Sequence, residues 1–296
     1  MSEKYLRDPG IGDTTELVDW VEAKLIVEDV NRASRSLLRK YLSEIILKDD
    51  DPTELDVQLD LLLAEIERRH GILENQYPFE IYRTGVKARK NNSLAYIFLL
   101  CLSTSFTFRD ENRQNQVESL LDYLILDALK KYFSNKSQGV HFGWPVTGDR
   151  PTHFVDAIEW LAKRIKLPVG VGKRRPLSKD GGVDVVVWCP FGDKREGFVT
   201  VLAQCTVKID WFHKAKDITP DVWRGWIDFG KDPVTCLAIP FVVPVSYEKW
   251  DELRRTVSMV IDRLRICEML QKIEFTKMDE IKEWTDNELL KMGGKI

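Results

Sequence analysis

Two apolar runs, at residues 183–189 and 198–209, most constrain how this 296-residue chain can fold. Both are rich in β-branched residues, and the glycine-containing, charged segment PFGDKREG connects them. β-Branched residues favour strands, and a short glycine-containing, charged segment favours the turn between two strands. We therefore predict an antiparallel β-hairpin. Strand alternation places Gln204, Thr206 and Lys208 together on one face of its second strand, toward the carboxyl end.

The rest of the chain shows mostly helical spacing of apolar residues. Helices are predicted at residues 14–26, 35–47, 53–70, 94–106, 114–133 and 153–167. Beyond Pro168 we predict a short strand at 169–171, the hairpin, a mostly helical stretch at 211–229, a strand at 235–243 and a long helix at 246–270. The segment SQGVHFGWPVTGDRP is predicted as a loop, because it is rich in glycine and proline.

These patterns divide the chain into three parts. Residues 1–110 are predicted to form a helical N-terminal region, 111–272 an α/β domain and 273–296 a helical C-terminal tail. The expected fold class is α/β (α+β), with a small mixed sheet flanked by helices.

Composition narrows the class of protein. The chain is 44% hydrophobic and 31% charged, as is typical of a soluble globular protein. Its five scattered cysteines lack zinc-site spacing, which favours a reducing cytoplasmic compartment over a disulfide framework. The chain shows no apolar signal region, and its longest apolar stretch is shorter than the ~20 residues of a membrane span. No GxSxG or P-loop motif supports acyl transfer or nucleotide hydrolysis.

Two polar residues interrupt the predicted hairpin strands. Asp184 begins the first strand and Gln204 lies in the second, so antiparallel pairing would bring them to the same end, with Lys208 nearby. Carboxylate and amide oxygens are ligands for Mg²⁺, and a lysine can stabilise charge that develops on a phosphoryl group. We expect Asp184 and Gln204 to bind Mg²⁺ or Mn²⁺ for phosphodiester hydrolysis. Taken singly, Asp184 could instead cap turn amides, and Gln204 could satisfy a buried partner.

The motifs DGGVD and Gln204–Cys205 resemble the PD-(D/E)XK nuclease superfamily, and within it the Mrr-type restriction endonucleases. The resemblance covers about residues 114–270. It implies a restriction-endonuclease-like core, magnesium-dependent cleavage of DNA and a role in defence against foreign DNA. It also implies an acidic residue from the first core helix, for which Glu118 and Glu159 are the two candidates.

One position departs from the Mrr pattern, because Thr206 replaces the lysine that follows the Gln-Cys pair. Lys208 or Lys214 could supply the missing charge. Lys214 is favoured, because its spacing from Trp211 matches a similar bacterial set of such proteins. If neither lysine supplies this charge, the domain is a catalytically inactive nuclease fold that binds DNA or another protein without cleaving DNA.

The segment 163–179 contains seven basic residues and no acidic one. Lys173, Arg174, Arg175 and Lys179 within it are expected to bind DNA phosphates, although such a run can also be a plain solvated surface. The N-terminal region could bind other proteins of a defence system, and oligomers are possible. Trp211, Trp223 and Trp226 are expected to pack in the core rather than stack on bases.

Overall fold

The computed structural model describes residues 6, 13–45, 52–83, 85–89, 93–105, 111–173, 179–271 and 274–294. The helices are α1 (Thr14–Val27), α2 (Arg35–Ile45), α3 (Pro52–Leu73), η1 (Glu74–Gln76), α4 (Leu94–Thr104), α5 (Glu111–Phe133), α6 (Phe154–Ile165), η2 (Trp211–Lys216), α7 (Pro220–Trp226), α8 (Trp250–Thr256), α9 (Arg263–Leu270) and α10 (Met278–Lys291). The strands are β1 (Arg32–Ala33), β2 (Phe79–Tyr82), β3 (Gly85–Ala88), β4 (Gln138–His141), β5 (Val185–Trp188), β6 (Thr200–Cys205), β7 (Val234–Ala238) and β8 (Met259–Ile261).

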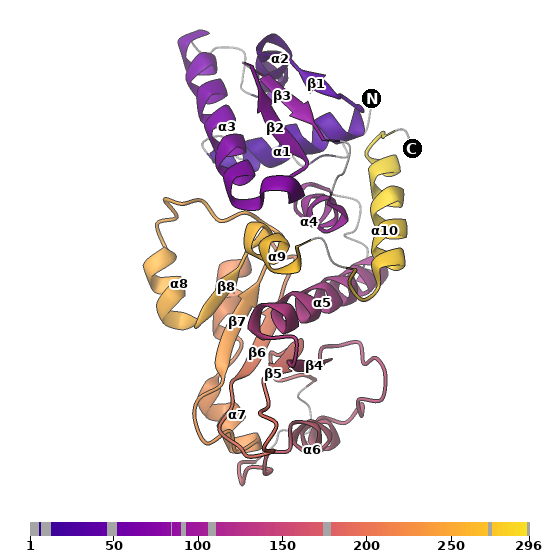
Figure 1. Ribbon diagram of the computed structural model, residues 1–296, viewed down its shortest axis with the longest axis vertical. Helices are drawn as coiled ribbons and strands as arrows, with labels where there is room; N and C mark the ends of the chain where they lie inside the picture. Colours follow the sequence, from indigo (N-terminus) through magenta and orange to yellow (C-terminus); the bar gives the residue numbers. More distant parts are fainter. Residues whose placement is uncertain are drawn as a thin grey trace.

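A five-stranded mixed sheet, in the order β4-β5-β6-β7-β8, forms the lower half of the molecule in Figure 1. Strands β4, β5 and β6 pair antiparallel, and β6, β7 and β8 pair parallel. Side chains on the face of Val185 and Val187 join the cluster around α5, and those on the face of Val186 and Trp188 pack with α6 and α7. Because both faces of β5 are buried, the strand consists almost entirely of valine.

The structure confirms the α/β fold class and the hairpin. It corrects the first strand of the sheet, which is β4 and lies in the segment predicted as a loop. Residues 169–171 contribute only one isolated bridge, from Val169 to Ile227. A four-residue strand that contains Gly139 and is followed at once by turn residues gives too weak a periodic signal to be recognised.

The predicted long helix at 246–270 is also wrong. The chain there forms α8, the edge strand β8 and α9. The β-branched run VSMVI separates the two helices and pairs with β7. Apolar spacing alone does not distinguish a short buried strand from a buried helical turn.

The N-terminal region contains the predicted helices α1 to α4 and, in addition, a three-stranded antiparallel sheet in the order β1-β3-β2. Helix α5 crosses between this region and the five-stranded sheet, while α9 and α10 return toward the N-terminal helices (Figure 1). One continuous hydrophobic cluster extends from Leu17 to Ile281. The three predicted parts of the chain therefore share a core. In the described part of the chain, no helix combines the length and apolar character that a membrane span requires.

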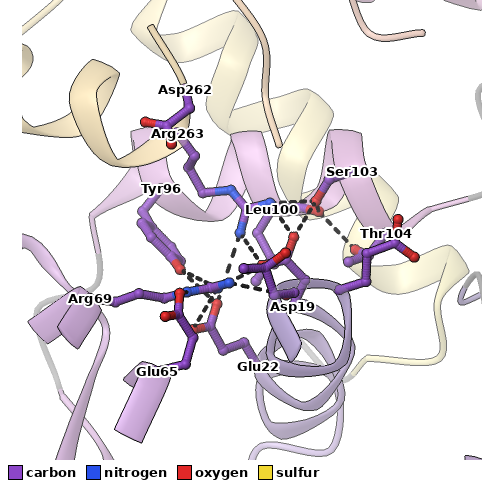
Figure 2. A network of polar contacts seen from close by, with 12 residues as sticks. Asp19, Glu22, Glu65, Arg69, Tyr96, Leu100, Ser103, Thr104, Asp262 and Arg263 are labelled. Atoms are coloured by element: carbon purple, nitrogen blue, oxygen red, sulfur yellow. Dashed lines mark hydrogen bonds and ion pairs between the residues drawn. The ribbon is translucent and has the colours of Figure 1, made fainter. Parts of the chain in front are cut away.

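A network of charged side chains is buried where the N-terminal helices meet α9 (Figure 2). Arg69 of α3 and Arg263 of α9 are both 0% exposed. Asp19 of α1 bridges them, with Oδ1 2.6 Å from Arg69 Nη1 and Oδ2 2.7 Å from Arg263 Nη2. Glu22, also fully buried, accepts a hydrogen bond of 2.7 Å from the Tyr96 hydroxyl. The network thus joins residues 244 positions apart in the chain.

Candidate functional site

Four elements of the fold meet at one end of the five-stranded sheet. Asp184 immediately precedes β5, Cys205 ends β6, His141 ends β4, and Asp122 comes from α5. The hairpin register pairs Val185 with Ala203, and the Asp184 amide donates to the Ala203 carbonyl at 2.8 Å. Asp184 and the next residue of β6, Gln204, are therefore opposite each other, at the end of the hairpin where both were expected.

The carboxylate of Asp184 is held by β6. Its Oδ2 accepts hydrogen bonds from Gln204 Nε2 at 2.6 Å and from the Cys205 amide at 2.8 Å. Gln204 Nε2 also donates to the Cys205 carbonyl at 3.0 Å, so both of its contacts are acceptors. The amide nitrogen of Gln204, rather than its oxygen, thus faces Asp184. In this arrangement Gln204 orients the carboxylate instead of sharing a ligand position with it.

Asp122, which the sequence analysis missed, completes the cluster. A carboxylate oxygen of Asp122, one of Asp184 and the sulfur of Cys205 all lie within 4.8 Å of one another. Asp122 is only 4% exposed and Asp184 is half-buried, so Asp184 is the more accessible of the two carboxylates. The available signal was a carboxylate in the apolar segment SLLDYLIL of an amphipathic helix, one turn after Glu118.

Both carboxyl groups bind their protons more tightly than usual. Burial raises the pKa of Asp122 well above its ordinary value, and the negative charges of Glu118 and Asp180 raise it further. Burial and the charge of Asp122 likewise raise the pKa of Asp184 well above its ordinary value. Two buried carboxylates this close cannot both ionise without a compensating cation. The arrangement favours either a shared proton or a bound metal ion.

His141 fixes the position of Asp122. Its Nε2 lies 3.0 Å from Asp122 Oδ2, its Nδ1 lies 2.7 Å from Thr147 Oγ1, and its ring stacks on Tyr123 with the centroids 5.2 Å apart. Burial, with the charge of Arg150, lowers the pKa of His141 to about 4, so the imidazole is neutral near pH 7. With Asp122 ionised, Nε2 donates to the carboxylate and Nδ1 accepts from the threonine.

Gly143 leaves the space between the carboxylates open. A Cβ atom at this position would lie 2.9 Å from Asp184 Oδ1 and 3.2 Å from Asp122 Oδ2. The Gly143 amide donates to the Asp184 carbonyl at 2.9 Å, which fixes this segment against the start of β5. Any side chain here would occupy the place where a ligand of both carboxylates would lie.

The two candidate lysines, Lys214 and Lys208, lie in different environments. Lys214, in η2, donates to Asp217 Oδ2 at 2.7 Å. That hydrogen bond raises the pKa of Lys214, and the charges of Asp184 and Asp180 add to the effect, so this ammonium lies within electrostatic range of the cluster. Lys208 is exposed and lies beyond the end of β6, so it does not continue the strand face as predicted.

The two candidate glutamates occupy different environments. Glu118 lies one helical turn before Asp122 on α5, and its charge raises the pKa of both Asp122 and Asp184. Glu159 is exposed on α6, whose buried side packs against α7 and the opposite face of the sheet. Of the two, Glu118 is brought near the cluster.

Of the basic residues expected to bind DNA, Lys173 and Lys179 are exposed, and Arg174 and Arg175 lie outside the described residues. Trp223 and Trp226 are buried, as predicted, at 0% and 6% exposure. Trp211 is partly exposed and packs against Tyr247, with the ring centroids 5.5 Å apart.

The donor set fits a divalent cation. Two carboxylates provide hard oxygen ligands and negative charge, and Gly143 leaves room between them. Burial raises the pKa of the Cys205 thiol well above its ordinary value, so the oxygens of Asp122 and Asp184 are the better ligands for Mg²⁺ or Mn²⁺. A hollow of about 660 Å³ lies elsewhere, beside β8, and is not part of this cluster.

Comparison with known proteins gives no relative: no protein-family model, no curated protein and no solved structure matches this chain.

Proposed function

We propose that this protein is a metal-dependent nuclease that hydrolyses phosphodiester bonds in DNA. The observation that supports this most is the pair Asp122 and Asp184, whose oxygens lie within 4.8 Å of the same sulfur and of each other at the end of the hairpin. Such a pair is costly to bury without a cation. Its position also agrees with the Asp and Gln-Cys motifs on which the resemblance to PD-(D/E)XK nucleases was based.

Each residue of the cluster has a distinct part in this proposal. Asp122 and Asp184 would hold Mg²⁺ or Mn²⁺, which when bound supplies Lewis-acid stabilisation of the phosphoryl oxygens. Gln204 and the Cys205 amide keep Asp184 in place, and His141 keeps Asp122 in place. Lys214 would stabilise the negative charge that develops during attack of water on phosphorus.

The proposal also covers the DNA contacts, the cellular compartment and the protein partners. Exposed Lys173 and Lys179 would contact DNA phosphates. All five cysteines are free thiols, which supports a reducing cytoplasmic compartment. The resemblance would assign the activity to defence against foreign DNA, with other defence proteins bound through the N-terminal region.

The direct test incubates the purified full chain with supercoiled plasmid in Mg²⁺, in Mn²⁺ and in EDTA. Nicked or linear DNA that appears only with metal is the expected result. If no DNA or RNA is cut with either metal, hydrolysis is the wrong function.

A second candidate function is that of a catalytically inactive nuclease fold, which binds DNA without cutting it. Two observations favour it: Thr206 occupies the usual lysine position, and Lys214 is hydrogen-bonded to Asp217. In that case plasmid would be bound but stay intact, with the same affinity in metal and in EDTA.

Gly143→Ala should weaken metal binding by about tenfold or more and suppress cleavage, because the new methyl group would enter the space between the carboxylates. The backbone of Gly143 does not have a positive φ, so alanine is conformationally allowed. Gly192→Ala is the matched control, since a Cβ there meets nothing within 4 Å. Titration calorimetry with Mn²⁺ measures the effect; equal affinity in the two variants would place the metal elsewhere.

Lys214→Ala should reduce the cleavage rate by ~10²-fold with little loss of DNA affinity, because a cation near the phosphoryl group acts mainly in the transition state. Lys208→Ala serves as the comparison and should have a smaller effect, because Lys208 is exposed beyond the end of β6. Single-turnover cleavage and anisotropy binding separate rate from affinity. Loss of activity in Lys208→Ala instead would reverse the assignment.

A further inference from the structure

Trp144 has an unusual position for a tryptophan. It directly follows Gly143, the residue packed against both carboxylates, yet 43% of Trp144 is exposed. The Lys179 ammonium lies 5.7 Å from the centre of its ring. An exposed aromatic ring and a lysine thus stand side by side next to the candidate metal site.

The loop that bears Trp144 is anchored on both sides of the ring. Before it, the amides of Phe142 and Gly143 both donate to the Asp184 carbonyl, at 2.7 and 2.9 Å. After it, the Thr147 hydroxyl contacts His141 at 2.7 Å. These contacts tie the loop to the two strands that carry the site.

Arg150 anchors the same loop to the segment that precedes Asp184. It is only 3% exposed, and its Nη2 donates to the Lys179 carbonyl at 2.6 Å. Its guanidinium lies 4.3 Å from the ring centre of Phe142. Trp144 and Lys179 are therefore held next to each other by buried contacts, while the Trp144 ring remains open to solvent.

We propose that Trp144 is a stacking platform for an unpaired nucleobase of the substrate, next to the phosphate at the carboxylate cluster. An aromatic ring held in place stacks on a base of any identity, and a neighbouring lysine binds the backbone of the same strand. In a duplex both faces of each base are already stacked, so this platform selects a single-stranded or flipped-out nucleotide. The inference rests on the proposed nuclease function and specifies its substrate class.

The test measures binding separately from cleavage. Fluorescence anisotropy in EDTA compares a labelled oligothymidylate with a labelled duplex for the wild type, Trp144→Ala and Trp144→Phe. Trp144→Ala should bind the single strand about tenfold or more weakly, because one stacked base is lost, while the duplex affinity stays within about twofold. Trp144→Phe should keep most of the affinity. Phe191→Ala is the control, because Phe191 is an exposed aromatic residue (64%) in the loop between β5 and β6, beyond the other end of β5.

A second measurement fixes the partner of the ring. A series of oligonucleotides carries a single abasic site at successive positions. The wild type should bind one member of the series more weakly than the others, and Trp144→Ala should show no loss of affinity for that member. Equal single-strand affinity in Trp144→Ala and the wild type overturns the platform, and so does an equal loss for duplex DNA. Absence of cleavage by the wild type in Mn²⁺, with the abasic pattern intact, would instead remove the proposed nuclease function alone.

Discussion

Asp184→Asn and Asp122→Asn should each lower metal-dependent cleavage by more than about 10²-fold. Each substitution removes one of the two negative charges that would hold the cation, and metal stabilisation of a phosphoryl transition state contributes several kcal/mol. Asparagine keeps the size of the side chain, and in the Asp184→Asn variant the new amide oxygen can still accept the hydrogen bonds from Gln204 and the Cys205 amide. Plasmid cleavage and Mn²⁺ calorimetry on the same preparations measure the effect.

The stability of the metal-free variants distinguishes loss of a ligand from loss of the fold. Burial raises the pKa of Asp122 in the folded chain, so the folded state retains a proton that the unfolded chain releases near pH ~3.9. Stability therefore falls as pH rises from the unfolded pKa to the raised folded pKa, above which the folded chain carries the buried negative charge. Asp122→Asn removes this penalty, and its melting temperature without metal should equal or exceed that of the wild type at about pH 8. A variant that cuts as well as the wild type would disprove the metal assignment.

Local sequence signals were sufficient for the hairpin and for its polar pair. Valine-rich runs joined by a charged, glycine-containing turn specify an antiparallel pair, and the pairing then determines that Asp184 and Gln204 are opposite each other. The atom that Gln204 presents to Asp184 depends on the Cys205 carbonyl, to which the same amide also donates. Residue type alone could not show that the nitrogen faces the carboxylate.

The third member of the cluster depends on how helices pack. Glu118 and Asp122 lie on neighbouring turns of α5, and only the packing of α5 across the sheet determines that Asp122 is buried beside Asp184. The family resemblance left Glu118 and Glu159 as candidates, and the position of Asp122 among leucines was a signal that the sequence prediction did not use. Trp144 was not identified either, because its place beside the cluster follows from tertiary contacts, among them those of Arg150 and Thr147, which tie its loop to other segments.

Whether the chain divides into separate domains could also be judged only from the tertiary structure. The first 110 residues were predicted to be helical throughout, and the resemblance to a nuclease core begins at about residue 114, which together suggested a domain boundary between them. The core cluster nevertheless continues across that position, and α9, from the far end of the α/β domain, packs against α3, α4 and α5. Arg263, one basic residue among many in the sequence, is fully buried in this contact.

Arg263→Ala should destabilise the protein by about 3–5 kcal/mol, because breaking a buried ion pair leaves an uncompensated charge. Arg263 donates to both carboxylate oxygens of Asp19, at 2.8 and 2.7 Å, and its Nε donates to the Pro240 carbonyl at 3.0 Å. Without it, Asp19 and Glu22 share Arg69 as the one remaining buried arginine of the network in Figure 2. Urea unfolding at neutral pH measures the free-energy change.

The pH dependence of this loss follows from Asp19. Burial alone would raise the pKa of Asp19, but Arg263 and Arg69 together hold it below its ordinary value. A carboxylate with a lowered pKa stabilises the fold above its unfolded pKa, and the stabilisation is lost as pH falls through the folded pKa. The stability difference between the wild type and Asp19→Asn should therefore be full at neutral pH and shrink in acid.

Arg255→Ala is the matched control for Arg263→Ala, because Arg255 is exposed on α8 and its loss should change stability by less than about 0.5 kcal/mol. A fragment of residues 111–272 provides the stronger test. It retains Arg263 but lacks Asp19, Arg69 and Tyr96, so an arginine that is fully buried in the whole chain loses its carboxylate partner. The fragment should fail to unfold cooperatively. Cooperative unfolding of the fragment would show that the α/β part folds independently of the N-terminal helices. Equal stability of the two arginine variants would show that the buried ion pair contributes little to stability.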